Sequence, residues 1–193
     1  MHELRILKLH NYFSTCRLCF SQGDLELPDA LRFLYWDEYP SRFLPPSFCG
    51  ENLVELKLQY SQLEQLWEGV QSLENLKAID LSFSKHLIKI PDLSQALNVE
   101  RVTLKFCERL HEVPSYFEDL TKLTSLNLKG CILLERVSAL PGNIIDVNLK
   151  HCTSLESLPT TICSLTSIRR LELSGCSKLD YSPELLEFLQ RLE

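Results

Sequence analysis

Cysteine and histidine are the residues of this sequence whose chemistry is most easily judged from their spacing. The 193 residues include eight cysteines and five histidines. Cys16 and Cys19 form a single CxxC pair, and the nearest histidines, His2 and His10, are not placed as in a four-ligand zinc site. We therefore expect no metal at this pair, and a structural zinc site is the alternative.

His151 and Cys152 are adjacent residues of the two types that can form a thiol nucleophile and its base. Neighbouring side chains of a strand point to opposite faces, so we expect the imidazole and the thiol to stay apart. The carboxylates of Glu112, Asp119 and Glu135 also lack a spacing that would bring two of them into one pocket. The sequence predicts no catalytic residue, no cofactor and no metal, and therefore a protein that is not an enzyme.

The overall composition restricts the kinds of partner. The formal net charge is −6 and the isoelectric point is near 5.4, so bulk electrostatics do not favour nucleic acid. No apolar run reaches the ~18 residues of a membrane span, and the sequence shows no secretory signal and no Asn-x-Ser/Thr site. These features predict an intracellular protein, located in the cytoplasm, with the nucleus as a second compartment.

An internal repeat accounts for most of the apolar residues. Its frame is LxxLxLxxC, and successive copies begin 21 to 24 residues apart. The first, fourth and sixth positions are apolar in all seven copies, which begin at Leu31, Leu53, Leu76, Val99, Leu123, Ile144 and Ile168. A weaker, earlier copy consists of Leu4, Leu7 and Leu9.

The ninth position of the frame holds a small polar group in most copies. The residues there are Tyr39, Ser61, Ser84, Cys107, Cys131, Cys152 and Cys176. A turn at this point leaves peptide groups unpaired, and a hydroxyl or thiol can bond to them. We expect the four cysteines to form a row of buried thiols; a metal site or a disulfide network is the alternative.

One repeat alone cannot bury its leucines, so neighbouring repeats must stack and share a core. This predicts an α/β leucine-rich-repeat solenoid, or horseshoe, with parallel strands on the concave face and short helical or 3-10 turns on the convex face. We expect a single domain, 1–193, of about eight repeats. Residues 1–30 form a degenerate first repeat with an inserted loop, 31–182 the regular repeats and 183–193 a truncated terminal repeat.

The positions of the frame that face outward are the candidates for partner contacts. Position eight carries aromatic residues in three consecutive repeats, and position seven carries lysine in three consecutive repeats, with His151 beside the last of them at position eight. We predict a partner-binding concave surface formed by Tyr60, Phe83, Phe106, Lys105, Lys129, Lys150 and His151. The alternatives are that the rings complete the core and that the lysines are ordinary solvated side chains. We expect Trp67 to be buried at the edge of its repeat.

The segment ENLVELKLQYSQLEQLWEGVQSLENLKAIDLS and the later LKGCILLERV and LSGCSKLDYSP resemble the repeat region of plant intracellular disease-resistance receptors. The subclass they resemble carries a Toll/interleukin-receptor-like domain and a nucleotide-binding switch domain. The resemblance covers essentially residues 1–193 and is strongest from Leu31 to Pro159. The sequence contains no GxxxxGK phosphate loop, so the nucleotide chemistry of that family is not carried over.

The resemblance implies a protein-recognition segment of an innate-immune receptor. Such a segment senses a pathogen effector or a guarded host protein and restrains the switch domain. Its expected partners are proteins, with no nucleic acid and no membrane span. A free-standing adaptor or decoy is the alternative, and the chain is expected to be a fragment or a truncated relative. An extracellular repeat receptor would instead show GxIP turns, glycosylation sites and capping disulfides.

Overall fold

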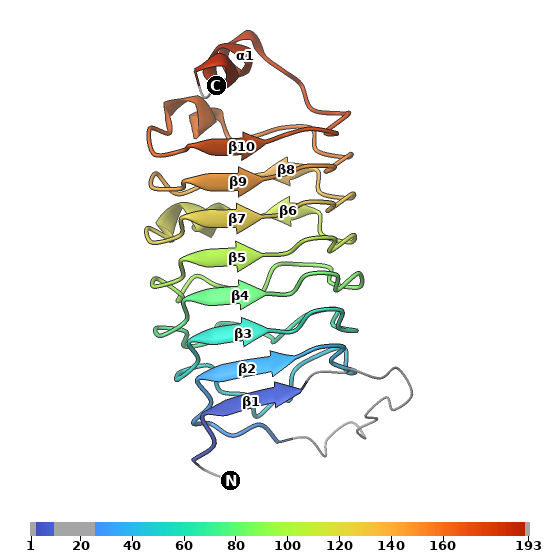
Figure 1. The fold of residues 1–193 in the computed structure, drawn as a ribbon, viewed down its shortest axis with the longest axis vertical. Coiled ribbons are helices and arrows are strands. Elements are labelled where there is room, and N and C mark those ends of the chain that lie inside the picture. The colour runs from blue at the N-terminus through green and yellow to red at the C-terminus, as the bar shows by residue number, and fades with distance from the viewer. Residues whose placement is uncertain (1–2, 10–25, 192–193) are drawn as a thin grey trace.

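Eight short parallel strands, one from each repeat, form the main sheet of the computed structural model, which describes residues 3–9 and 26–191 (Figure 1). They follow one another in chain order and are each three or four residues long. The strands are β1 (Ile6–Leu9), β2 (Phe33–Trp36), β3 (Glu55–Lys57), β4 (Ala78–Asp80), β5 (Arg101–Thr103), β7 (Ser125–Asn127), β9 (Asp146–Asn148) and β10 (Arg170–Glu172).

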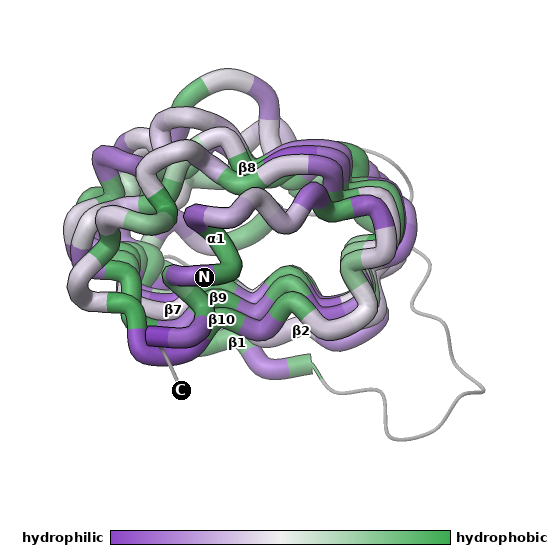
Figure 2. The backbone as a smooth tube through the Cα atoms, turned by 90° about the horizontal axis from the view of Figure 1, so that it is seen from above, coloured by the Kyte–Doolittle hydropathy of each residue, from purple (hydrophilic) through white to green (hydrophobic). Residues whose placement is uncertain are grey.

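The strand register follows the repeat frame. Leu34 pairs with Leu56, Leu56 with Ile79, and Leu126 with Val147, so the fourth position of each repeat lies beside the fourth position of the next. Seen along the solenoid axis, the coils superimpose on one ring, with the main sheet on one side and β8 on the opposite side (Figure 2). The predicted leucine-rich-repeat solenoid is confirmed.

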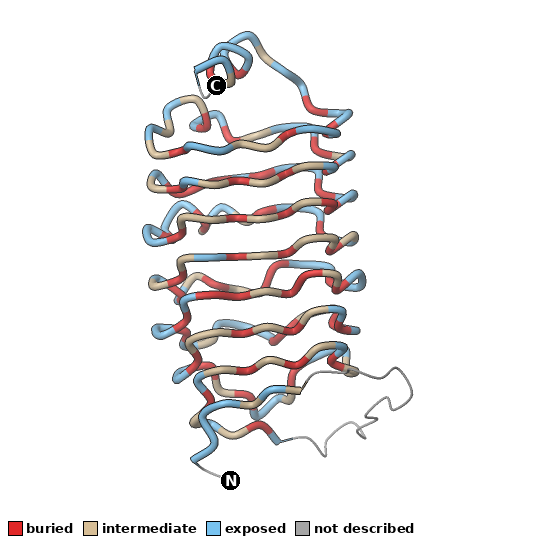
Figure 3. Tube along the Cα trace, in the orientation of Figure 1, coloured by how far each residue is buried: buried red, intermediate tan, exposed pale blue. Residues whose placement is uncertain are grey.

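The core is a set of stacked inward rows. Leu81, Leu104, Leu128 and Leu149, the sixth residues of four successive repeats, are all 0% exposed. The predicted first, fourth and sixth positions are buried in all seven regular repeats, except that Leu171 of β10 is half-buried. In the weaker first copy Leu4 is exposed, and Leu7 and Leu9 are half-buried. Figure 3 shows the result as buried residues that recur at the same place in successive coils. Each coil therefore depends on its neighbours for a dry interior.

The ninth position lies in the predicted turn after the strand, which we call the corner. The Sγ atoms of Cys107, Cys131, Cys152 and Cys176 donate to the carbonyl oxygens of Leu81, Leu104, Leu128 and Leu149 over 3.1–3.2 Å. The Ser84 hydroxyl donates to the Leu58 carbonyl in the same way over 3.2 Å. Each of these five side chains thus donates a hydrogen bond to the carbonyl oxygen of the sixth residue of the preceding repeat. All four cysteines have free thiols, and the buried thiol row is confirmed.

The convex side combines the predicted short helices with an additional sheet. The 3-10 helices η1 (Ser115–Asp119) and η2 (Thr160–Ser164) each follow a proline, as expected. A second sheet of two parallel strands, β6 (Glu112–Val113) and β8 (Arg136–Val137), was not predicted from the sequence. Its strands come directly before the point where proline or an irregular segment ends the pairing.

The helix α1 (Pro183–Gln190) lies at the C-terminal end of the solenoid (Figure 1). The Ser182 side chain accepts a hydrogen bond from the Leu185 backbone N–H, and proline occupies the first turn, where its missing N–H costs nothing. Leu185 and Phe188 are buried in the core cluster. The segment predicted as a truncated repeat therefore contains a capped helix that packs on the last coil.

Several predictions lie outside the described residues. The CxxC pair of Cys16 and Cys19, together with His2 and His10, falls within the ranges that the structure leaves out, as does most of the predicted inserted loop. In the part that the structure describes, no helix is long and apolar enough to cross a bilayer.

Replacing Leu128 with aspartate is expected to destabilise the solenoid by on the order of 5 kcal/mol, because it places an unpaired charge in a fully buried position. The melting temperature followed by circular dichroism measures this effect. Asn127→Asp is the matched control, because the neighbouring side chain faces outward and its Oδ1 already accepts from the Lys129 N–H. If both variants melt like the parent protein, the assignment of the core is wrong.

High pH is expected to lower the free energy of unfolding through the buried corner thiols. Burial raises the pKa of the Cys107 and Cys152 thiols from 9.0 to about 12. In the unfolded chain these thiols lose their protons near pH 9, whereas in the folded chain they keep them until about pH 12. The free energy of unfolding therefore falls as the pH rises through this window, by about 1 kcal/mol per thiol at pH 10.

Urea unfolding between pH 8 and 11 measures this loss. Cys107→Ser/Cys152→Ser should show a smaller fall, because serine makes the same corner bond at Ser84 without titrating in this range. Cys49→Ser is the matched control at a half-buried position. An equal pH dependence in the double variant and the parent protein would contradict the assignment.

Candidate functional site: an aromatic and a basic row at the edge of the sheet

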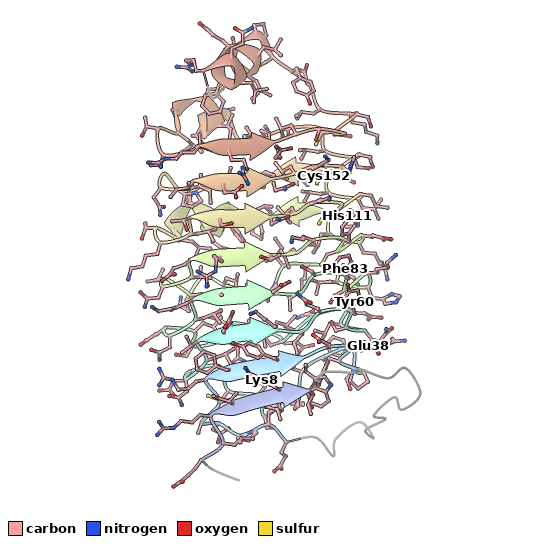
Figure 4. All side chains as sticks on the ribbon, in the orientation of Figure 1. Lys8, Glu38, Tyr60, Phe83, His111 and Cys152 are labelled. Atoms are coloured by element: carbon pink, nitrogen blue, oxygen red, sulfur yellow. The ribbon has the colours of Figure 1, made fainter. Side chains whose placement is uncertain are left out.

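The eighth residue of every regular repeat has a left-handed backbone. Its φ lies between 55° and 84° in all seven copies: Glu38, Tyr60, Phe83, Phe106, Gly130, His151 and Gly175. The strands end at position five, or at position six in β2, so these residues lie in the turn beyond the strands. Position eight therefore lies beside the strand face and not on the strands themselves. The row lies at the lateral edge of the sheet, as Tyr60 and Phe83 show in Figure 4.

The left-handed turn allows each repeat to bond to the next. The backbone N–H of Phe83 donates to the carbonyl oxygen of Lys105, and that of Phe106 donates to Lys129, over 2.7 Å in both cases. The N–H of Gly130 donates to Lys150 over 2.8 Å. These carbonyls belong to position seven, so the lysines and the rings are parts of one hydrogen-bonded ladder.

Three aromatic rings stack along this ladder. We call Tyr60, Phe83 and Phe106 the ring row. The first two rings have centroids 4.6 Å apart and planes 3° apart, and the next two have centroids 5.1 Å apart and planes 14° apart. Neighbouring strands of a sheet lie ~4.8 Å apart, so the strand spacing itself sets the stacking distance.

The ring row is neither fully exposed nor part of the core. Tyr60 is 51% exposed, whereas Phe83 and Phe106 are half-buried. The three residues are absent from the buried core cluster. Each ring covers its neighbour and leaves an edge at the surface. The sequence left open whether the rings are exposed or complete the core, and the observed arrangement lies between these alternatives.

Each aromatic run ends on a glycine. A Cβ atom at Gly130 would lie 2.4 Å from the Phe106 ring, and a Cβ atom at Gly175 would lie 2.4 Å from Nδ1 of His151. The Phe106 and His151 rings therefore lie directly over the glycine of the following repeat. Glycine adopts the positive φ without strain at these two positions and leaves the space that the ring takes.

The three predicted lysines lie in consecutive repeats that continue from the end of the ring row, and the two rows share the repeat of Lys105 and Phe106. We call Lys105, Lys129 and Lys150 the lysine row. Nζ of Lys129 lies 5.7 Å from the centroid of the Phe106 ring, within the range of a cation–π contact. Within residues 3–9 and 26–191, no carboxylate forms an ion pair with any of the three. The row is therefore basic surface without internal neutralisation.

His151 and Cys152 point apart, as predicted, but for a different reason. The Cys152 thiol is buried and donates to the Leu128 carbonyl, while His151 is exposed at the end of the row. The two residues do not alternate along a strand; the left-handed turn at His151 directs its ring outward. Burial raises the pKa of Cys152 to about 12, so this thiol is a poor nucleophile.

Glu112 and Glu135, weighed as candidate acids, lie exposed on the convex side near basic groups. Oε2 of Glu112 is 3.1 Å from Nε of Arg136, and Oε1 of Glu135 is 3.7 Å from Nδ1 of His111. Asp119 lies at the end of η1. The structure does not bring these carboxylates together with the ring row or the lysine row.

Trp67 is buried, as predicted. It is 7% exposed, and its ring stacks on Phe48 with centroids 6.0 Å apart and planes 12° apart. Its indole Nε1 is buried and has no hydrogen-bond partner among the residues that the structure describes. Its packing accounts for this tryptophan without a ligand.

A second cluster, on the strand face near the N-terminus, was missed by the sequence reasoning. The Tyr35 ring lies between two cations, with Nζ of Lys8 and Nζ of Lys57 each 4.9 Å from its centroid. Its hydroxyl donates to Glu55, and burial together with this bond raises the pKa of Tyr35 to about 12. Lys8, Tyr35 and Lys57 occupy position five of three successive strands, and Glu55 occupies position three, so the position-five column of the repeat would have revealed the two cations beside the ring.

Replacing Gly130 with alanine is expected to destabilise the protein by about 2 kcal/mol. Roughly half of this comes from the positive φ, and the rest from displacement of the Phe106 ring. In a Phe106→Asn background the ring is absent, so the same replacement should cost only about 1 kcal/mol. A double-mutant cycle by urea unfolding measures this coupling.

Gly142→Ala is the matched control for this cycle, because its Cβ atom would meet no atom within 4 Å. We expect its effect to stay within about 0.5 kcal/mol. Additive costs for the changes at 106 and 130 would show that the ring does not occupy the space above Gly130.

Comparison with known proteins agrees with the leucine-rich-repeat architecture of the chain. A Leucine Rich Repeat family model matches residues 52–71. The chain is 51% identical over 109 residues to the disease resistance protein RML1B of Arabidopsis thaliana, covering 56% of this chain and 11% of that protein. It is 43% identical over 148 residues to RPP2A of the same plant, covering 75% of this chain and 11% of that protein. The chain thus spans about a ninth of the length of these relatives.

Among solved structures, the leucine-rich repeat domain of the type III effector XopL has a similar fold. The TM-score is 0.52 at 22% identity, and the match covers 72% of this chain and 58% of that one. At this identity the likeness concerns the fold alone. Together with the stacked repeats, the relatives show that this chain is a leucine-rich-repeat region of the kind found in plant disease resistance proteins.

Proposed function

We propose that this chain is the protein-recognition segment of a plant innate-immune receptor. In this role it senses a pathogen effector or a guarded host protein, and it helps to restrain a switch domain. The relatives support this role because they are named disease resistance proteins. An intracellular location, in the cytoplasm or the nucleus, is part of the same proposal.

The observation that carries the proposal is the pair of rows at the edge of the sheet. The ring row leaves ring edges at the surface, and the lysine row, which continues from its end, carries charges that no ion pair of the described residues neutralises. Aromatic residues dominate binding hot spots, and uncompensated charges orient an approaching partner. Neither row is needed to fill the core, so both are available for contacts.

Binding suits this surface better than catalysis. The thiols nearest to it belong to the buried corner, where burial raises the pKa of Cys107 to about 12 and holds the pKa of Cys131 well above its usual value. A nucleophilic cysteine needs the opposite shift. The groups that remain at the edge of the sheet are aromatic rings, ammonium groups and one imidazole. Such groups bind the surface of a partner by packing and charge.

The proposal predicts that partner binding depends on the ring row. Partner capture from plant extracts, with and without pathogen proteins, compares this chain with the variant Tyr60→Asn/Phe83→Asn/Phe106→Asn. Asparagine tolerates the left-handed backbone, so the variant should stay folded. We expect it to lose at least about tenfold of the captured partner, because hot-spot rings each contribute on the order of 1–2 kcal/mol.

The control for this comparison is Phe43→Asn, which removes an exposed ring outside the row. Capture of the same partner in equal amounts by the parent chain and by the ring-row variant would refute the proposal. The identity of the captured protein then distinguishes a pathogen protein, a host protein and a nucleotide-binding domain.

A further inference from the structure

The side-chain hydrogen bonds at the ends of β7 and β9 leave two amide donors unused. Oδ1 of Asn127 accepts from the Lys129 N–H over 3.2 Å, and Oδ1 of Asn148 accepts from the Lys150 N–H over 3.1 Å. The Nδ2 groups of both asparagines have no hydrogen-bond partner among the described residues. Each side chain has thus used its acceptor and kept its donor.

The lysine row adds ammonium groups in the same repeats. Lys129 and Lys150 lie two residues after these asparagines, and Lys105 lies two residues after Thr103, in the repeat of β5 (Figure 1). None of the three lysines forms an ion pair with a residue in the ranges 3–9 and 26–191. These groups form what we call the donor patch: Lys105, Asn127, Lys129, Asn148 and Lys150.

Carboxylates border the donor patch at both ends. Position five holds Asp80 in the preceding repeat and Glu172 in the following repeat. The carboxylate of Asp146, at position three of β9, is 3.8 Å from the Arg170 guanidinium. An acidic partner is therefore attracted over three repeats and repelled beyond them.

The backbone of the patch is already occupied. The carbonyl oxygens of all three lysines accept from the position-eight N–H groups of the preceding repeats. The N–H groups of Lys129 and Lys150 donate to the asparagines. A partner therefore cannot bind here by adding a strand, and recognition must use side chains. Carboxylates complement the patch because they only accept hydrogen bonds and carry negative charge.

We propose that the donor patch binds the acidic face of a helix from a partner protein, which lies along the solenoid axis and presents one carboxylate to each of the three repeats. This inference rests on the proposed function and specifies its partner. In the repeats of Lys129 and Lys150, one ammonium and one amide group can donate to the two oxygens of the same carboxylate. Of the ring row, only Phe106 shares a repeat with the patch.

The spacing of the repeats fits a helix better than an extended segment. Three lysines in neighbouring repeats span two strand spacings, roughly 10 Å. A helix rises about 1.5 Å per residue, so glutamates at i, i+4 and i+7 lie on one face and span about 10.5 Å. Three carboxylates on one side of an extended segment span about 13 Å. Only the helix places its carboxylates in step with the repeats.

A synthetic helix tests this directly. The probe is an alanine-based peptide, held helical by a lactam bridge on its opposite face, with glutamates at i, i+4 and i+7. Its isomer has the same composition with glutamates at i, i+2 and i+5, which distributes them around the helix. Fluorescence anisotropy measures the affinity of both for this chain. We expect the first peptide to bind at least about tenfold more tightly, and to bind more weakly as salt is raised.

Replacement of the two amides provides the second arm. In Asn127→Asp/Asn148→Asp the turn bond is kept, since Oδ1 of Asp80 accepts from the Ser82 N–H in the same way over 2.9 Å. Only the outward donors become acceptors. We expect the affinity for the first peptide to fall at least about tenfold with little change in the melting curve. The matched control, Gln62→Glu/Gln95→Glu, makes the same change of charge at exposed positions outside the patch and should retain binding.

Removal of the ammonium groups provides the third arm. Lys105→Gln/Lys129→Gln/Lys150→Gln should also lower the affinity at least about tenfold. Its control, Lys77→Gln/Lys89→Gln/Lys122→Gln, removes as much charge at exposed positions outside the patch and should retain binding.

Equal affinities for the two helices, no binding of either, or equal losses in a patch variant and its control would overturn this inference. The peptide titration requires no natural partner, so its failure is distinct from that of the proposed function. If capture of a natural partner still depended on the ring row, the proposed function would stand and only the acidic helix would be wrong.

Discussion

The left-handed turn at the eighth position is the constraint on which the rest of the structure depends. A chain that leaves a strand and turns into the convex segment must pair its peptide groups although it has left the sheet. The positive φ directs the position-eight N–H to the next repeat, and the corner hydroxyl or thiol bonds to the sixth residue of the preceding repeat. Each turn is thus tied in both directions, and the strands remain in register.

The same turn produces the surface that we propose for binding. A tyrosine or phenylalanine with positive φ is strained by about 1–2 kcal/mol, so these residues are unfavourable there unless something offsets the cost. Stacking of neighbouring rings supplies about 0.5–1.5 kcal/mol per pair, and the strand spacing brings the rings to the right distance. Where stacking ends, at Gly130 and Gly175, glycine removes both the strain and the steric conflict. Whether a repeat can carry a bulky residue at this position therefore depends on the residue at the same position in the preceding repeat.

The sequence predicted those parts of the fold that repeat. The inward positions one, four and six and the polar ninth position follow from a period of 21 to 24 residues, since only stacked coils can bury them. It did not predict the positive φ of Tyr60 or Phe83, because aromatic residues disfavour that conformation and the repeat frame alone does not reveal it. The pairing of β6 with β8 also requires knowledge of which residues lie side by side between coils outside the repeat frame. Those contacts depend on the register, which became certain only in the structure.

Recognition and stability use different positions of the same repeat. The buried positions hold the coils together without regard to charge, whereas positions five, seven and eight carry groups whose identity the core does not fix. Lys129 illustrates the separation: its carbonyl and N–H are bound within the ladder, while its ammonium group is free to contact the Phe106 ring or a partner. A fixed backbone with exchangeable side chains allows the edge of the sheet to acquire a new specificity at little cost in free energy of unfolding. The scaffold recurs in every repeat, whereas the pattern of exposed side chains does not. A single sequence therefore predicts the scaffold more readily than the ligand.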